Sequence, residues 1–148
     1  MTCIVYKKGV MVGDGRETII EDNESPIINT DDSVKVFRLK DGRLFGASKA
    51  SESCLRLHES LIKGFGPPKL DDINGLLIDL KGKLWFFEGN IWYPLKEKCY
   101  AIGSGARFAL PALDAGATAI QACKIGIKRD PYSGGKITVV RQFARRRK

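Results

Sequence analysis

The stretch TCIVYKKGVMVGD, residues 2–14, decides the fold because it contains two short β-rich segments separated by a turn signal. Lys8-Gly9 in its middle suits a two-residue hairpin loop. With this loop, pairing outward along the two segments brings Cys3 opposite Asp14. The register therefore predicts that a carboxylate lies beside the first residues of the chain.

Thr2, which opens this stretch, has two interpretations. If the initiator Met1 is removed, the free α-amine of Thr2 lies within reach of its own hydroxyl and can act as its base. Alternating strand geometry puts Thr2, Ile4 and Tyr6 on one face, so the hydroxyl is expected to point toward an apolar layer. The alternative is that Thr2 is an ordinary second residue, and the rest of the sequence has to decide between them.

A second hairpin is predicted within residues 33–47, where an Asp-Gly turn signal at 41–42 separates two β-rich runs. A two-residue loop at that position would bring Lys35 opposite Ser48. Both faces of the first run are largely apolar, so Lys35 is expected in a covered position that requires a carboxylate such as Asp14. A lysine that extends to solvent at the strand end is an equally weighted alternative.

The remaining pattern predicts antiparallel strands alternating with helices. Residues 17–32 are polar and contain Pro26, so they are expected to be mostly loop, with a short pairing at 19–20 or 27–28. Helices are predicted at residues 50–63, 107–115 and 118–129, and strands at residues 75–80, 83–87, 91–93, 100–103 and 136–142. Long hairpins with helices on their outer faces indicate the α+β class.

Length and composition indicate one globular domain. The chain has 148 residues, 43% of them hydrophobic, and we expect a single domain at residues 1–143 followed by a basic tail at 144–148. Much of the excess behind the formal net charge of +8 lies in the last few residues, which are expected to be solvated. No aromatic-rich basic strand accompanies the tail, so nucleic acid is not expected as the main partner.

A membrane protein and a metal or disulfide framework are not expected either. No apolar run is long enough to span a bilayer, and the first residues do not resemble a leader. The four cysteines are scattered without C-x-x-C spacing, which favours reduced thiols in a cytoplasmic protein. The single histidine, His58, lies in a helical stretch among leucines, where a surface or partly packed position is favoured over a catalytic one.

Short motifs along nearly the whole chain resemble the proteasome β-subunit and HslV-type peptidase family of N-terminal nucleophile hydrolases. Each motif is weak alone, but all of them occur in the family's order, beginning at the amino terminus. They are TCIV at residues 2–5, GDGR at 13–16 with Thr18, KVFRL at 35–39, Gly46, AIGSG at 101–105, AGA at 115–117 and DPYSGG at 130–135.

The resemblance implies a four-layer αββα sandwich of two antiparallel sheets, the fold of N-terminal nucleophile hydrolases. The chain departs from the family after its first helix, where only the short, proline-rich residues 64–74 replace a usual second helix. One outer helical layer is therefore expected to be reduced. Because that layer often meets a cap or an ATPase ring, the departure argues against an ATPase ring partner that the resemblance would otherwise allow.

The resemblance also implies a catalytic set, namely Thr2, Asp14, Lys35, Gly46, Ser104, Asp130 and Ser133. Thr2 matches the nucleophile, and its α-amine would be the general base once Met1 is removed. An α-amine has an ordinary pKa of roughly 7.7–8.0, and the Lys35 ammonium, held by Asp14, would lower it. The Gly46 N–H matches the oxyanion donor, a contact that typically contributes about 3–4 kcal/mol. Ser104, Asp130 and Ser133 match the network that surrounds the amine and orders the water for proton transfer.

Substrate contacts are implied at four further positions of the chain. Leu44 and Ser48 fall where the family lines its first specificity pocket, with Ser33 as a further contributor. Thr18 matches a position that hydrogen-bonds an extended substrate backbone. A medium-sized apolar residue before the scissile bond is the preference expected from these residues.

The leading hypothesis is a threonine endopeptidase that hydrolyses unfolded or peptide substrates through an acyl-enzyme, without a cofactor, inside a closed homo-oligomeric ring. The alternative is a catalytically inactive, proteasome-like structural or regulatory subunit that binds an acidic partner. The complete polar set favours the peptidase. A retained Met1 would favour the alternative, because it would block the amine of Thr2.

Overall fold

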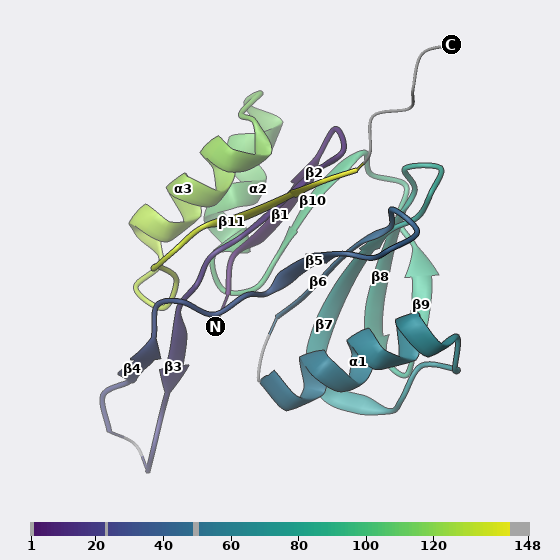
Figure 1. Ribbon diagram of the computed structural model, residues 1–148. Coiled ribbons are helices and arrows are strands. Elements are labelled where there is room, and N and C mark those ends of the chain that lie inside the picture. Colours follow the sequence, from purple (N-terminus) through teal and green to yellow (C-terminus); the bar gives the residue numbers. More distant parts are fainter. Residues whose placement is uncertain (1, 23, 49–50, 143–148) are drawn as a thin grey trace.

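The computed structural model describes residues 2–22, 24–48 and 51–142, which form two stacked β-sheets flanked by helices (Figure 1). Met1 and the basic tail predicted at 144–148 lie outside the described residues. Within the described ranges, no helix combines the length and apolar character needed to cross a bilayer.

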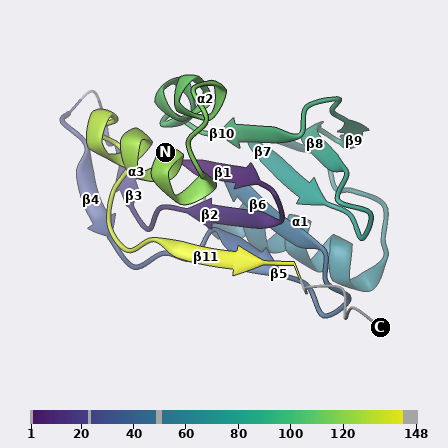
Figure 2. The same ribbon diagram turned by 90° about the horizontal axis from the view of Figure 1, so that it is seen from above.

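The first sheet is antiparallel and contains the first and last strands of the chain. Its strands lie in the order β10, β1, β2, β11 (Figure 2), with the bounds Cys99–Ile102, Ile4–Lys7, Val10–Gly13 and Thr138–Arg141. Helices α2 (Ala106–Asp114) and α3 (Ala119–Arg129) cover its outer face. Small buried side chains such as Ala122 let α3 pack closely against Val5 and Val12.

The second sheet is also antiparallel and has one helix on its outer face. Its strands β5, β6, β7, β8 and β9 lie in chain order, with the bounds Val36–Arg38, Leu44–Ser48, Leu70–Ile78, Leu84–Gly89 and Ile91–Pro94. Helix α1 (Ser51–Lys63) packs on Phe45 and Phe87 through Leu57. The chain passes from α1 to β7 without a further helix, so the predicted reduction of one outer layer is confirmed.

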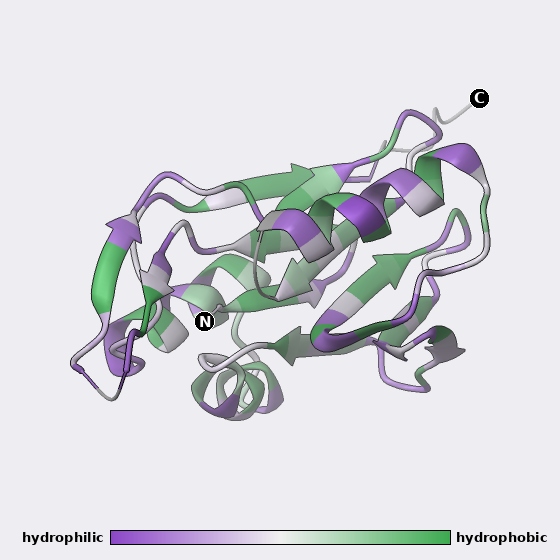
Figure 3. Cartoon of the chain, turned by 90° about the horizontal axis from the view of Figure 1, so that it is seen from below, coloured by the Kyte–Doolittle hydropathy of each residue, from purple (hydrophilic) through white to green (hydrophobic). Residues whose placement is uncertain are grey.

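The inner faces of the two sheets pack on each other and form the centre of the core. Ile4 and Met11 of the first sheet belong to one buried cluster with Val36, Leu44 and Leu76 of the second. The helices carry alternating hydrophobic and hydrophilic bands (Figure 3), as helices with one buried face do. The layer order helix, sheet, sheet, helix is the predicted αββα sandwich.

The first hairpin has the predicted register. Lys8 and Gly9 have φ angles of 48° and 78° and form the two-residue loop, the geometry that matches the twist of paired strands. Just beyond the paired segment, the Asp14 N–H donates to Cys3 O at 3.1 Å. Asp14 consequently lies beside the start of the chain, as predicted.

The second hairpin differs from the prediction by one residue. The Leu39 N–H closes a loop of residues 40–42, in which the glycine has a φ angle of 99°. Hairpins with such a third loop residue are common, and an Asp-Gly pair suits both loop lengths. As a result Lys35 pairs with Ala47, whose N–H donates to Lys35 O at 3.2 Å, and not with Ser48.

A two-stranded ribbon projects from one end of the sandwich (Figure 1). It consists of β3 (Glu17–Ile19) and β4 (Ile27–Thr30), so the short pairing expected within residues 17–32 is present. The register shifts between Glu17 and Thr18, which marks a β-bulge. Since a bulge redirects the side chains that follow it, the ribbon can turn residues toward the open end of the sheets.

Candidate active site

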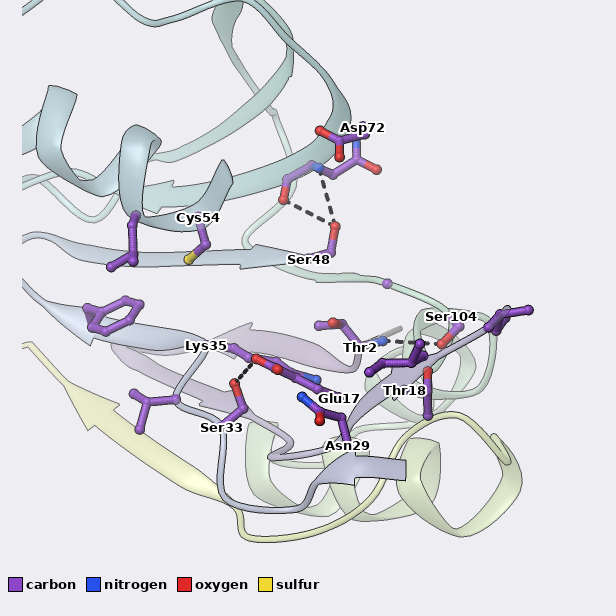
Figure 4. Close-up of a pocket in the computed structure, with 17 residues that line it drawn as sticks. Thr2, Glu17, Thr18, Asn29, Ser33, Lys35, Ser48, Cys54, Asp72 and Ser104 are labelled. Carbon is purple, nitrogen blue, oxygen red and sulfur yellow. Dashed lines mark hydrogen bonds between the residues drawn. The ribbon is translucent and has the colours of Figure 1, made fainter. Parts of the chain in front are cut away.

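A cleft of about 800 Å³ opens at the end of the sandwich from which the ribbon projects. Ser48, Cys54 and Asp72 line one side, contributed by β6, α1 and β7, and Glu17 and Ser33 line the other (Figure 4). Thr2, Lys35 and Ser104 also reach this cleft. The two hairpins and the ribbon thus bring segments that are distant in sequence to one concave surface.

Thr2 is held by its backbone at the cleft. Only 1% of its surface is exposed, and its carbonyl accepts a hydrogen bond from the Gly105 N–H at 3.0 Å. Gly103 has a φ angle of 93°, and a Cβ atom there would lie 2.1 Å from Thr2 O, so only glycine fits. Thr2 Oγ1 is buried and has no hydrogen-bond partner within the described residues.

A chain of polar side chains leads from the Thr2 nitrogen into the protein. Thr2 N donates to Ser104 Oγ at 3.3 Å, and Ser104 Oγ donates to Asp130 Oδ2 at 2.6 Å. Ser133 Oγ donates to the same carboxylate oxygen, also at 2.6 Å. Asp130 is 1% exposed and also accepts the Tyr132 N–H. The structure therefore brings together the three residues predicted to surround the terminal nitrogen.

Asp14 and Lys35 form a buried ion pair, as the sequence predicted. Lys35 Nζ lies 2.9 Å from Asp14 Oδ1, and the two side chains are 7% and 0% exposed. The alternative, a lysine that extends to solvent, is therefore excluded. Asp14 also accepts hydrogen bonds from the backbone N–H groups of Cys3, Arg16 and Gly134. A buried charge is tolerated when it is paired and hydrogen-bonded in this way.

Arg16 supports this pair from the ribbon side, a role that the sequence did not indicate. Its carbonyl accepts a hydrogen bond from Lys35 Nζ at 2.6 Å. Its guanidinium forms a salt bridge with Asp31 at 2.8 Å, and this contact raises the pKa of Arg16 and lowers that of Asp31. Gly134 packs on the guanidinium, since a Cβ atom at that position would lie 2.6 Å from Arg16 Cζ.

The predicted substrate-binding residues Thr18, Ser33 and Ser48 all line the cleft. Thr18 Oγ1 is buried and has no hydrogen-bond partner in the described part of the chain. Ser33 Oγ donates to Glu17 Oε1 at 2.6 Å. Ser48 Oγ donates to Asn74 O at 3.2 Å, which joins the end of β6 to the middle of β7.

Leu44 and Gly46, predicted as a specificity-pocket residue and the oxyanion donor, are not among the residues that line the cleft. Leu44 is fully buried between the two sheets. Gly46 lies inside β6, paired with Val36 on one side and Leu76 on the other, so its backbone groups face neighbouring strands. The end of β6 at Ser48, two positions further on, is the part of this strand that meets the cleft.

Glu17, Cys54 and Asp72 line the cleft although the sequence did not single them out. Burial, with a further contribution from the negative charge of Glu17, raises the pKa of the Cys54 thiol to about 11. Glu17 is next to the predicted substrate-binding residue Thr18 in the sequence. Its place in the cleft could be recognised only once the geometry of the β3–β4 ribbon was known. His58 is not among the lining residues and stacks on Phe37 with ring centroids 4.6 Å apart, as expected for a packed histidine.

Comparison with known proteins identifies the fold. No family model and no curated protein matches the chain. Eukaryotic HslV from Trypanosoma brucei is a structural match with a TM-score of 0.66 and 16% identity, covering 94% of this chain and 97% of that one. Thiobacillus denitrificans BPH in complex with epoxomicin matches with a TM-score of 0.61 and 15% identity, covering 97% and 99%. BPH alone gives a TM-score of 0.62 at 16% identity, covering 96% and 98%.

These matches extend over nearly the full length of both partners. At such low identities the likeness concerns the fold. It agrees with the layer order helix, sheet, sheet, helix. The chain therefore has the αββα fold of the proteasome β-subunit and HslV-type proteins.

Proposed function

We propose that this protein is a peptidase whose nucleophile is Thr2, released as the amino terminus by removal of Met1. The observation that carries the proposal is the environment of Thr2. Its buried hydroxyl lines a cleft without a hydrogen-bond partner among the described residues, while its nitrogen contacts Ser104. A buried hydroxyl without a partner is costly, and such groups occur at functional sites.

The terminal nitrogen of Thr2 is the proposed base. As an amide within the chain this nitrogen cannot accept a proton, so the chemistry requires that Met1 leaves. The α-amine then takes the proton of Oγ1 as the oxygen attacks the substrate carbonyl, and it returns a proton to the leaving amine. The resulting ester is hydrolysed by water. Ser104, Asp130 and Ser133 orient the amine and this water through their short hydrogen bonds.

The Lys35 ammonium supplies positive charge next to the reacting hydroxyl. Asp14 fixes the ammonium in position through the 2.9 Å contact. The ammonium held in this way stabilises negative charge that develops on the attacking oxygen without a movement of side chains. The oxyanion donor, assigned to Gly46 by the resemblance, is better sought where β6 ends at Ser48, because this end of the strand lines the cleft.

The substrate is proposed to be an extended peptide or an unfolded chain. β3 pairs with β4 along one edge, and Thr18 carries a buried hydroxyl without a partner in the described residues. An extended chain that aligns with β3 would offer hydrogen-bonding groups to the backbone of β3 and to the Thr18 hydroxyl. We further propose a homo-oligomeric ring in the cytoplasm and a single domain at residues 1–143. An ATPase ring partner remains disfavoured by the single outer helix, and no observation favours the inactive alternative.

Peptide hydrolysis by three proteins tests the proposal: wild type, Thr2→Ala and Thr2→Ser. Both replacements are small, so removal of Met1 is unaffected. Wild type should turn over a fluorogenic peptide, Thr2→Ser should retain part of the rate, and Thr2→Ala should have none while its far-UV spectrum stays unchanged. Full activity in Thr2→Ala would show that another group is the nucleophile.

A further inference from the structure

We propose that the cleft selects a substrate residue with a positively charged side chain, and that Glu17 is the residue that selects it. This inference rests on the proposed peptidase function, and it names the substrate class of that same cleft. It replaces the apolar preference expected from the sequence, which relied on Leu44. That side chain is fully buried between the sheets and does not line the cleft.

Glu17 is positioned to meet a substrate side chain. It lies at the start of β3 and lines the cleft together with Lys35 and Ser33 (Figure 4). Glu17 as a residue is half-buried, and its Oε1 accepts the Ser33 hydroxyl at 2.6 Å, which holds the side chain in one place. The charge of Glu17 contributes to the raised pKa of Cys54 on the opposite side, so its field extends into the cleft between them.

Glu17 provides negative charge in the cleft. Among the described lining residues, the charged side chains are Glu17, Lys35 and Asp72. The charge of Lys35 is matched by the buried Asp14 carboxylate behind it. Glu17 adds a negative charge on one side of the cleft, while Asp72 on the other side is exposed and accepts the Ser53 hydroxyl. A cation that enters the cleft is attracted by the Glu17 carboxylate.

The walls of the cleft suit a long side chain with a charge at its end. Phe37, Val34 and Leu55 provide apolar lining in the cleft that Glu17 also lines. Lysine and arginine bury their methylene groups against such surfaces while the charged end reaches a polar partner. An apolar substrate side chain would instead take water away from Glu17 without replacing it, which is unfavourable for an ionised group.

The first test compares kcat/KM for peptides that differ only in the residue before the cleaved bond, which is arginine, leucine or glutamate. Wild type should prefer the arginine peptide. In Glu17→Gln, which keeps an acceptor for the Ser33 hydroxyl, this preference over leucine should fall by roughly tenfold or more. Glu17→Lys should shift the preference toward glutamate. Glu24→Gln is the matched control, because it removes the same charge from an exposed position outside the cleft.

The second test separates this inference from the proposed chemistry. Fluorescent peptides ending in arginine, leucine or glutamate are bound to the Thr2→Ala protein, with or without Glu17→Gln, and anisotropy gives each Kd. Tighter binding of the arginine peptide that is lost with Glu17→Gln supports the inference even if wild type cleaves nothing. Equal cleavage of arginine and leucine peptides by wild type and Glu17→Gln would overturn it while the peptidase proposal stands. Equal or absent binding of all three peptides would also overturn it.

Discussion

The buried pair of Asp14 and Lys35 offers a quantitative test of how the site is held together. Asp14 is fully buried and accepts hydrogen bonds from Lys35 Nζ and from the backbone N–H groups of Cys3, Arg16 and Gly134. Replacing Asp14 by alanine removes the partner of a buried ammonium and the acceptor of these backbone groups. Replacing Lys35 by methionine leaves the carboxylate with its backbone donors.

The two replacements should therefore lower the free energy of unfolding by different amounts. Loss of one partner of a buried ion pair typically destabilises by about 3–5 kcal/mol, and each buried N–H left without an acceptor adds roughly 1–3 kcal/mol. The destabilisation by Lys35→Met should lie near the lower end of the range for a broken ion pair, about 3 kcal/mol, because the backbone donors still stabilise Asp14. Asp14→Ala should exceed about 5 kcal/mol, which approaches the whole stability of a domain of this size.

Urea unfolding followed by far-UV circular dichroism measures these differences as shifts of the midpoint at constant slope. The expected order of stability is wild type, then Lys35→Met, then Asp14→Ala. Both variants should also lose peptide turnover, Lys35→Met while still folded. An Asp14→Ala protein within about 1 kcal/mol of wild type would refute the argument, because the buried carboxylate would then hold nothing in place.

Three further predictions concern side chains and glycines around the site. Burial lowers the pKa of His58, so its NMR titration should have a midpoint below 6.5 and the unfolding free energy should decrease as the pH falls below that value; a higher midpoint would contradict the packing. Cys54, with a pKa of about 11, should react with iodoacetamide at pH 8 more slowly than the partly exposed Cys99, as measured by peptide mass spectrometry. Gly116→Ala should cost about 1–2 kcal/mol for its positive φ alone. Gly103→Ala, which has the same strain plus a clash with the Thr2 carbonyl, should cost clearly more in thermal unfolding, and equal losses would contradict this close approach.

Local turn chemistry accounts for the part of the site that could be predicted from the sequence. The loop at Lys8-Gly9 determines the register that places Asp14 beside Cys3. The apolar character of the second hairpin made a covered Lys35 one of two equally weighted interpretations, and a covered lysine needs a carboxylate. These inferences use only neighbours along a hairpin, where spacing translates directly into position.

The errors arise where one sequence suits two geometries. The loop at residues 40–42 is one residue longer than predicted, so Lys35 pairs with Ala47 and not with Ser48. Leu44 and Gly46 were assigned by resemblance to the family, and neither is among the residues that line the cleft. Glu17 was missed because its position depends on a bulged ribbon within residues that looked like a loop.

The polar residues around the Thr2 nitrogen could be found only through the resemblance to a known family. Ser104, Asp130 and Ser133 meet at one carboxylate oxygen, although a helix pair separates the first from the other two. No local periodicity links positions so far apart in the chain, since their meeting depends on how α2 and α3 pack on the first sheet. Only a known fold with the same motif order could suggest the contact.

The most direct test of the central claim is the intact mass of the protein before and after incubation with epoxomicin, the compound bound to BPH in its solved complex. We predict a mass without Met1, a single inhibitor adduct located on the peptide that begins at Thr2, and no adduct on Thr2→Ala. A protein that retains Met1 and forms no adduct, or an adduct of equal yield on Thr2→Ala, would contradict the assignment of Thr2 as the nucleophile.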